Sequence, residues 1–316
     1  MPPDVSVSAP AKIILFGEHA VVYGEPAIAV PVTALRAQVE IHPAEPGAGL
    51  VIESPKTRHR FVYHPEDDPE AQSTLEYVAR LVLAHFGADP PDVTLHLASR
   101  IPIGRGLGSG AAVATAVARG LVGALGETIA PDALNSIIYE VEKRHHGTPS
   151  GIDNTVVVYE KPVFFVRGQP IEDVRVRAQF SLLVADTGYS TPTHVPVGDV
   201  RRLMERKPER TQQVVARIGE ITRAAREALG AGQFKRLGDL MTENHDQLQR
   251  LTVSSIELDL LCDSALMAGA HGAKMSGGGR GGNMIALVDN HRVEPVMSAL
   301  YAAGAERVIK TRVSAH

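Results

Sequence analysis

The chain lacks tryptophan and contains a single cysteine, Cys262, among its 316 residues. One cysteine excludes an intramolecular disulfide, and it also excludes a zinc site built from cysteines. Aromatic residues make up only 4% of the chain, and a protein that stacks bases or sugar rings on aromatic side chains usually contains more. The composition therefore argues against disulfide scaffolds, cysteine-based zinc proteins and aromatic binding platforms.

A strong positive charge and a long hydrophobic run are missing too. The formal net charge is −4, which gives no reason to expect a nucleic-acid partner. The longest stretch of small apolar residues, 111–125, contains Arg119 and is too short to span a bilayer. The amino-terminal residues MPPDVSVSAP have neither the charged start nor the apolar stretch of a signal peptide. We therefore expect a cytoplasmic protein of enzyme size without a membrane partner.

Hydrophobic periodicity changes along the chain, and the composition shifts near residue 180. The shift predicts two domains, 1–180 and 181–316, the first rich in strands and the second rich in helices. Strands are expected at 5–9, 12–16, 37–41, 51–63, 93–98, 181–186 and 284–288, and a hairpin around Glu160 at 156–166. Helices are expected at 69–86, 111–125, 131–144, 211–229, 233–251, 256–270 and 293–303.

The segment Pro102–Ala112 reads PIGRGLGSGAA and lies between a predicted strand and an alanine-rich helix. Glycine permits positive φ and lets backbone amides approach a ligand closely. The helix that follows directs unpaired N–H groups at the loop, which favours an anion site. An ordinary flexible turn is the alternative. The segment is neither a P-loop, since no GKS or GKT follows, nor the dinucleotide fingerprint, because its spacing differs.

A second glycine cluster, Lys274–Asn283, reads KMSGGGRGGN and contains five glycines around Arg280. A plain connection between a helix and a strand would need fewer glycines. Close approach of the backbone to a ligand or to another loop is therefore the better interpretation.

Charged side chains interrupt apolar surroundings in the first thirty residues. Lys12 precedes the run GEHAVVYGEPAIA, which carries the pair Glu18 and His19. A lysine at a strand edge is usually a surface residue, and a Glu-His pair usually lies in a solvated turn. Both residue types can also serve in a polar site.

Two acidic residues follow later in the chain. HGTPSGIDN, residues 146–154, forms a loop that is expected to deliver Asp153 and Asn154 to the start of a strand. Loop aspartates more often cap backbone amides. Glu142 lies near the end of a predicted helix, where an exposed glutamate is normally just solvated. His145 and His146 are adjacent, and no other His or Cys has a matching spacing, so transition-metal binding is not expected.

Taken together, PAK at residues 10–12, the Gly17–Ala29 run, PIGRGLGSGAA, HGTPSGIDN and KMSGGGRGGN resemble the GHMP kinases. That family includes galactokinases, homoserine kinases, mevalonate kinases and phosphomevalonate kinases. The motifs stand in the family's order and span essentially the whole chain. The resemblance implies a two-domain α/β (α+β) GHMP kinase fold, with a ribosomal S5 domain 2-like amino-terminal domain that binds ATP and a ferredoxin-like carboxy-terminal domain.

The resemblance also implies roles for individual residues. Asp153 matches the catalytic carboxylate, and Lys12 matches the residue that orients it. Glu142 and Ser109 match the Mg²⁺ ligands. Glu18 and His19 match the positions that bind the acceptor. The ATP-binding positions are Pro102, Gly104, Gly106, Leu107, Gly108, Ser109, Gly110 and Ala111. These parts suit phosphoryl transfer, which depends on positioning and on stabilising charge.

Within the family, the Gly17–Ala29 and 146–154 motifs are most similar to the mevalonate kinase branch. ATP and Mg²⁺ as cofactors, mevalonate as the acceptor at its 5-hydroxyl, and a possible homodimer are the corresponding expectations. A kinase of another acceptor such as phosphomevalonate, or a catalytically silent binding protein, are the alternatives. Two positions depart from the family's pattern: Gly110 replaces a second serine, and Arg280 replaces a glycine.

Overall fold

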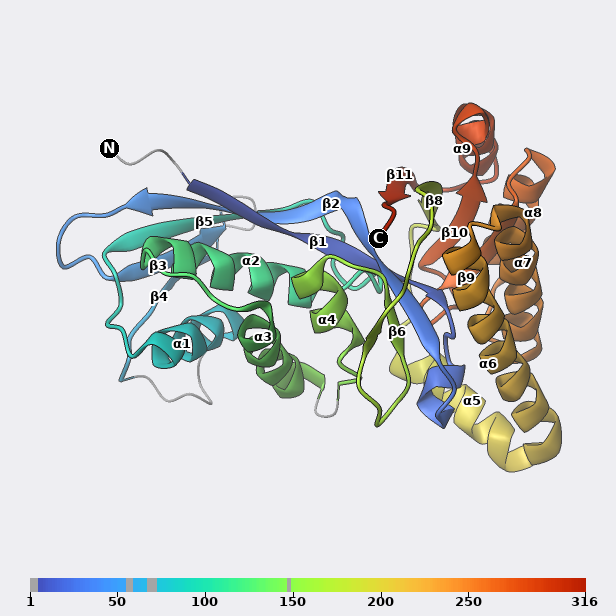
Figure 1. The fold of residues 1–316 in the computed structure, drawn as a ribbon, viewed down its shortest axis with the longest axis horizontal. Coiled ribbons are helices and arrows are strands. Elements are labelled where there is room, and N and C mark those ends of the chain that lie inside the picture. The colour runs from blue at the N-terminus through green and yellow to red at the C-terminus, as the bar shows by residue number, and fades with distance from the viewer. Residues whose placement is uncertain (1–4, 55–58, 67–72, 147–148) are drawn as a thin grey trace. The chain divides into compact units, whose positions relative to one another are not determined.

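The computed structural model describes residues 5–54, 59–66, 73–146 and 149–316 (Figure 1). The chain divides into two compact units that interleave in sequence. Unit 1 comprises residues 1–11, 35–103 and 108–160, and unit 2 comprises residues 12–34, 104–107 and 161–316. The strands β1 (Val5–Phe16) and β2 (Ala27–Pro43) each contribute residues to both units. The expected boundary near residue 180 stays a prediction.

In its described residues, unit 1 combines strands with four helices. Its other strands are β3 (Leu50–Ser54), β4 (His59–Val62) and β5 (Val93–Ser99). Strand β5 pairs antiparallel with β2 and parallel with β3, and β3 pairs antiparallel with β4. The helices are α1 (Thr74–Phe86), α2 (Ser109–Ala124), α3 (Pro131–His146) and α4 (Ile152–Tyr159). In Figure 1 they lie together along one side of these strands.

Small residues let helix α2 pack directly on the strands of unit 1. Val39 and Ile41 point to the same side of β2, since alternate residues of a strand share a face. A methyl group added at Gly120 would lie 2.6 Å from Val39 Cγ1, and one at Gly123 would lie 3.2 Å from Ile41 Cδ1. The alanines expected to form a small face, Ala111, Ala112, Ala114 and Ala118, are all buried.

The expected hairpin at 156–166 is wrong, and Asp153 and Asn154 begin a helix rather than a strand. Residues 152–159 form α4, and only Val163–Phe165 forms a strand, β6. The valines Val156, Val157 and Val158 favour a strand by local preference. They are buried where α4 packs with α2 and α3, so tertiary packing overrides that preference.

An ion-pair cluster holds the end of α4 in unit 1. Glu160 ends the helix in a left-handed conformation with φ 55°. Its carboxylate accepts two hydrogen bonds from Arg36 at 2.9 and 3.0 Å and one from Arg119 at 2.7 Å. Burial raises the pKa of Glu160, but these two arginines outweigh it and leave the pKa lowered. Arg36 and Arg119 also donate to the hydroxyl and the carbonyl of Ser8. The cluster thus ties α4 to β1, β2 and α2.

Unit 2 contains a four-stranded antiparallel sheet in the order β11-β8-β10-β9. Its strands are β8 (Phe180–Asp186), β9 (Gly272–Ser276), β10 (Asn283–Val288) and β11 (Arg307–Val313). Its helices are α5 (His194–Arg206), α6 (Pro208–Ala231), α7 (Phe234–Arg250), α8 (Ile256–Met267) and α9 (Val293–Ala302). Short elements complete the unit: η1 (Ala20–Tyr23), β6, β7 (Glu172–Asp173) and η2 (Asn290–Arg292).

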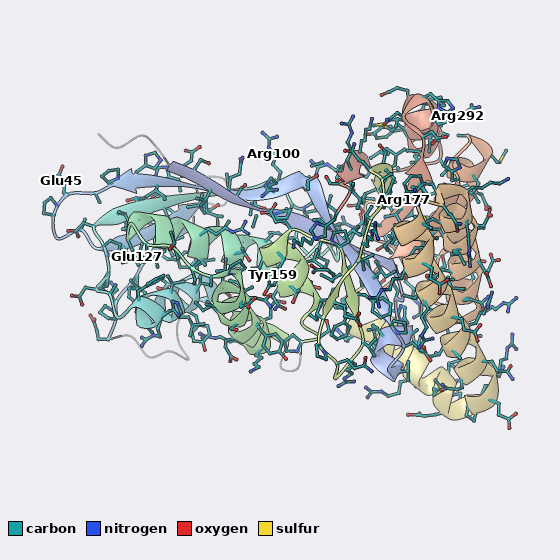
Figure 2. All side chains as sticks on the ribbon, viewed as in Figure 1. Glu45, Arg100, Glu127, Tyr159, Arg177 and Arg292 are labelled. Carbon is teal, nitrogen blue, oxygen red and sulfur yellow. The ribbon has the colours of Figure 1, made fainter. Side chains whose placement is uncertain are left out.

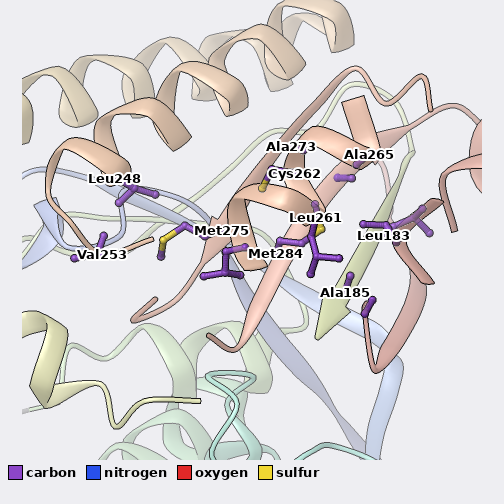
Figure 3. Packing of buried hydrophobic residues seen from close by; sticks show 14 of the residues in the cluster. Leu183, Ala185, Leu248, Val253, Leu261, Cys262, Ala265, Ala273, Met275 and Met284 are labelled. Carbon is purple, nitrogen blue, oxygen red and sulfur yellow. The ribbon is translucent and has the colours of Figure 1, made fainter. Parts of the chain in front are cut away.

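The core of unit 2 lies between this sheet and its helices. Figure 3 shows ten labelled members of one buried cluster, among them Leu183 and Ala185 from β8 and Leu261 and Cys262 from α8. The cysteine is buried and apolar contacts surround it, so it behaves as a small hydrophobic residue here. Charged side chains such as Glu45, Arg100 and Glu127 lie at the surface instead (Figure 2).

Most helices expected from periodicity are confirmed, including α6, α7, α8 and α9. The expected strands at 181–186 and 284–288 are confirmed as β8 and β10. Strands β9 and β11 and helix α5 were not expected, so the second half is less purely helical than its composition indicates. Within the described ranges, no helix has the length and apolar character needed to cross a membrane.

Gly120→Ala should lower the free energy of unfolding relative to Gly123→Ala by about 1–3 kcal/mol, the usual cost of overpacking a core. The new methyl group would meet the buried, stiff side chain of Val39. At Gly123 it would meet only the movable end of Ile41. Both changes gain the same helix propensity, so Gly123→Ala is a matched control. Equal midpoints in urea unfolding would contradict this packing.

Candidate active site

The strand β1 carries Lys12 into unit 2, where it is 6% exposed rather than a surface residue. Its backbone N–H donates to the carbonyl of Leu107 at 3.0 Å, which joins β1 to the first glycine loop. The same loop is held from the other side, because Asn283 donates to the carbonyl of Arg105 at 2.6 Å and Arg105 donates to the carbonyl of Gly188 at 2.6 Å. Gly104 and Gly106, on either side of Arg105, both have φ 72° and are exposed.

Glu18 and Lys274 form a buried ion pair in unit 2. Lys274 is 0% exposed and Glu18 is 1% exposed. The Nζ atom of Lys274 donates to Glu18 Oε1 and to the carbonyl of Met275, the latter at 2.7 Å. The two residues are 256 positions apart in the sequence. The pair fastens the turn after β1 to strand β9.

Burial dominates the electrostatics of this pair. Burial raises the pKa of Glu18, and the charges of Lys274 and Lys12 oppose that rise. Burial likewise lowers the pKa of Lys274, and Glu18 opposes that fall. The charged form of each group is therefore stabilised by the other against the effect of burial. Removing one partner would leave a buried charge without compensation, which is more costly than losing the pair altogether.

His19 is also buried and lies at the start of η1. Its Nε2 atom is 2.9 Å from the carbonyl of Gly278. Since a carbonyl only accepts, Nε2 carries the proton and Nδ1 is left as an acceptor. Burial lowers the pKa of His19 to about 4, so the ring is neutral at pH 7. Among the described residues, neither His19 Nδ1 nor Glu18 Oε2 has a hydrogen-bond partner, although both atoms are buried.

Gly17 and the glycines of the second glycine cluster allow the backbone segments around Glu18 and His19 to pack closely. A Cβ atom at Gly17, where φ is 93°, would lie 2.3 Å from the carbonyl oxygen of Pro26. One at Gly279 would lie 2.0 Å from the carbonyl oxygen of Val253. The expectation that the second cluster serves close approach to another loop is therefore confirmed. His19 itself adopts a left-handed φ of 61°, a conformation that costs a residue other than glycine some strain.

Arg280 adopts the left-handed conformation too, with φ 53°, which accounts for the glycine that the family usually has there. Its guanidinium forms an ion pair with Asp199 on α5 and donates to the carbonyl of Thr252 at 3.3 Å. Its backbone N–H donates to Val253 at 2.8 Å. The guanidinium of Arg280 therefore binds protein acceptors.

Two more candidate residues meet in unit 1. Helix α2 begins at Ser109, directly after Gly108, whose φ is 66°. Glu142 on α3 is 5% exposed. A Cβ atom at Gly110 would lie 3.6 Å from Glu142 Oε1, so this carboxylate faces the first turn of α2. Pro102 and Ala111 flank the glycine loop in this unit, and Ala111 is buried.

Asp153 stands in the first turn of α4, after Gly151 with φ 86°. The next residue, Asn154, is 2% exposed and donates to Asn135 Oδ1 on α3 at 2.7 Å. Asn135 in turn donates weakly to Thr155 at 3.4 Å. These bonds fix the start of α4 against α3, and Asp153 is held with it. Residues 147–148 of the HGTPSGIDN motif lie outside the described residues.

The chain matches two family models. One, for the GHMP kinases N terminal domain, matches residues 73–161, and the other, for the GHMP kinases C terminal, matches residues 225–306. A curated mevalonate kinase of Thermococcus sibiricus is 35% identical over 325 residues, which cover 98% of this chain and 96% of the relative. The chain belongs to the GHMP kinase family. The resemblance and the two-domain α/β fold expected from the motifs are thereby confirmed.

Further similar proteins support the assignment of the chain to the GHMP kinase family. A mevalonate kinase of Thermococcus gammatolerans is 36% identical over 328 residues, covering 96% of this chain and 95% of the relative. Among solved structures, the mevalonate kinase of L. major in complex with R-mevalonate has a TM-score of 0.82 and 27% identity. It covers 100% of this chain and 98% of the other.

Lys274 is the polar residue of this region that the sequence interpretation missed. It was placed at the start of the glycine cluster, although it lies inside the buried strand β9. A local signal exists, since one lysine stands among the apolar and small residues of GAKMS. A buried lysine requires an anionic partner, and Glu18 in another apolar context was the matching candidate.

Lys274→Met should destabilise the protein by about 3–5 kcal/mol, because it leaves the buried Glu18 carboxylate without its cation. Adding Glu18→Gln should recover part of this loss, since the double variant buries no charge. Denaturant midpoints of both single variants and the double variant would measure the coupling. The exposed Lys235 offers a control, Lys235→Met, with little expected effect. Strictly additive single effects would contradict a tight pair.

Stability should fall in mild acid because of His19. Its folded pKa of about 4 is below the ordinary histidine pKa of 6.5, so the unfolded chain binds more protons between these values. Stability from the neutral ring is complete above the unfolded pKa and is lost as pH falls toward the folded one, by about 2 kcal/mol at pH 5. His19→Asn, which tolerates the left-handed φ, should remove this loss, and the exposed His85→Asn should retain it. Parallel stability curves for wild type and His19→Asn would contradict the assignment.

Proposed function

We propose that this protein is an ATP-dependent mevalonate kinase that transfers the γ-phosphoryl group of ATP to the 5-hydroxyl of mevalonate. The observation that carries the proposal is the match to curated mevalonate kinases at 35–36% identity over nearly the whole chain. The buried acceptor atoms of Glu18 and His19 support it, because each can accept a hydrogen bond from an alcohol or from water.

ATP would bind through the first glycine loop and the start of α2. The N-terminus of this 16-residue helix presents backbone N–H groups and a partial positive charge to an anion. We assign the phosphate contacts to Gly104, Gly106, Leu107, Gly108, Ser109, Gly110 and Ala111, with Pro102 at the edge of the loop. The four glycines among them, which lack a side chain, let the backbone approach the phosphates closely.

Mg²⁺ would be held by Glu142 and Ser109. The fit rests on the buried carboxylate of Glu142, which faces the first turn of α2 where Ser109 stands. Carboxylate and hydroxyl oxygens are the hard ligands that Mg²⁺ prefers, and the ion keeps several waters. The bound ion would neutralise charge on the phosphates. Gly110 leaves room beside Glu142 for a water where the family has a second serine.

Asp153 and Lys12 are the residues that we assign to the reaction itself. Asp153 would accept the proton of the mevalonate 5-hydroxyl as that oxygen attacks phosphorus, and Lys12 would orient Asp153 and stabilise the developing negative charge. His19 Nδ1 and Glu18 Oε2 would accept hydrogen bonds from the substrate's hydroxyl groups and set its orientation. Lys274 positions Glu18 and does not react.

The contacts of Arg36 disfavour a phosphomevalonate kinase. A phosphorylated acceptor needs cations in addition to Lys12, and Arg36 is the next basic residue in the sequence after the Glu18 and His19 pair. Its guanidinium donates to Glu160 and Ser8 within unit 1. A catalytically silent binding protein is disfavoured because Lys12, Glu142 and Asp153 are all retained.

Asp153→Asn should lower kcat for mevalonate by roughly 10²–10⁴, the usual contribution of a positioned acid–base group, and should leave ATP binding near normal. Asp132→Asn, at the start of α3, is a control that should retain activity. ATP consumption should be measured against mevalonate, phosphomevalonate, homoserine and galactose. A kcat for Asp153→Asn within twofold of wild type would contradict the proposed catalytic role of Asp153. A higher kcat/KM with another acceptor would contradict the assignment of mevalonate as the substrate.

A further inference from the structure

A second cluster of ligand-type side chains lies in unit 1, on the strands β2, β5 and β3. One nitrogen or oxygen atom each from Glu40, His42 and His96 lies within 4.8 Å of the others. Glu53 joins them, since its Oε1 atom is 2.7 Å from His96 Nε2. The imidazole rings of His42 and His96 have centroids 4.3 Å apart.

Strand register explains why these four side chains meet. Glu40 and His42 are two residues apart on β2 and therefore share one face of the sheet. His96 on β5 is the direct partner of Glu40, and Glu53 on β3 is the direct partner of His96. Helix α2 packs on the Val39 side of β2. The cluster consequently lies on the opposite face of the sheet.

We propose that this cluster, the sheet-face site, binds a divalent transition-metal ion of the Zn²⁺ class. The two imidazoles of His42 and His96 and the carboxylate of Glu40 form a His₂Glu ligand set, to which a water adds the fourth ligand. Imidazole favours Zn²⁺ and its neighbours over Mg²⁺ and Ca²⁺, which take oxygen ligands. The site is thus chemically distinct from that proposed for Mg²⁺ at Glu142.

The geometry needs only side-chain rotation to close around an ion. Bonds of about 2.0 Å to tetrahedral zinc place neighbouring ligand atoms about 3.3 Å apart, which is closer than the 4.8 Å limit found here. Glu40 is exposed, and His42 and His96 are about one-third exposed, so these side chains can turn. The strands themselves are fixed by their backbone hydrogen bonds.

Glu53 acts as the outer carboxylate of the sheet-face site. Metal-bound histidines usually donate their second ring N–H to a carboxylate, which fixes the ring and strengthens the ligand. Glu53 Oε1 stands at that distance from His96, and Arg60 Nε lies 3.9 Å from Glu53 Oε2. An ion in the site would cross-link β2 and β5 and stabilise unit 1 through binding to the folded state.

The test is a calorimetric titration of the untagged full chain with Zn²⁺, without nucleotide. Wild type should bind one ion at this site, and Zn²⁺ should raise its melting temperature. His96→Asn and His42→Asn should each lose this binding, and Glu53→Gln should weaken it roughly 10–100-fold. His85→Asn, an exposed histidine on α1, should bind as wild type does. Co²⁺ bound by wild type should show the visible absorption of a tetrahedral complex.

Two results would overturn the proposal. One is the absence of Zn²⁺ binding by wild type, which would leave the four residues as ordinary cross-strand pairs. The other is binding that persists unchanged in both His96→Asn and His42→Asn, which would place the ion on other histidines. Circular dichroism should first show that each variant is folded, and Glu53→Gln provides a test that removes no histidine.

Discussion

The buried ion pair between Glu18 and Lys274 is the constraint around which the proposed acceptor side of the site is built. It fastens the turn after β1 to strand β9 and is reinforced by the hydrogen bond from His19 to Gly278. Because both charges are buried, neither can leave without a large cost. Gly17 and Gly279 permit the backbone contacts that this arrangement requires. In the described structure, Glu18 Oε2 and His19 Nδ1 remain as buried acceptor atoms.

In unit 1, too, the residues that fix the backbone differ from the residue that we assign to the reaction. The cluster of Glu160, Arg36 and Arg119 fixes the end of α4, and Asn154 fixes its beginning against α3. Asp153 stands in the first turn of α4, next to Asn154, and is positioned with it. Arg36, a basic residue that a phosphorylated acceptor would require, instead donates to Glu160 and Ser8 within unit 1.

Sequence patterns predicted the long helices and the glycine loops because periodicity and glycine spacing are local signals. They failed at α4, where three buried valines favour a strand but pack as a helix, and at β9, where Lys274 concealed a buried strand. The pairing of Glu18 with Lys274 depends on contact across 256 positions, which no local pattern encodes. The roles of Asp153, Lys12 and Glu142 came from the family resemblance and stay predictions, although the structure shows how each is held.

Identification of the product by nuclear magnetic resonance is the most direct measurement. The wild-type protein should be incubated with ATP, Mg²⁺ and mevalonate labelled with carbon-13 at C5, and phosphorus and carbon spectra recorded. A phosphate ester coupled to C5, formed in step with ADP, is the result that the account predicts. Unchanged mevalonate, or a phosphate on a different oxygen, would contradict it.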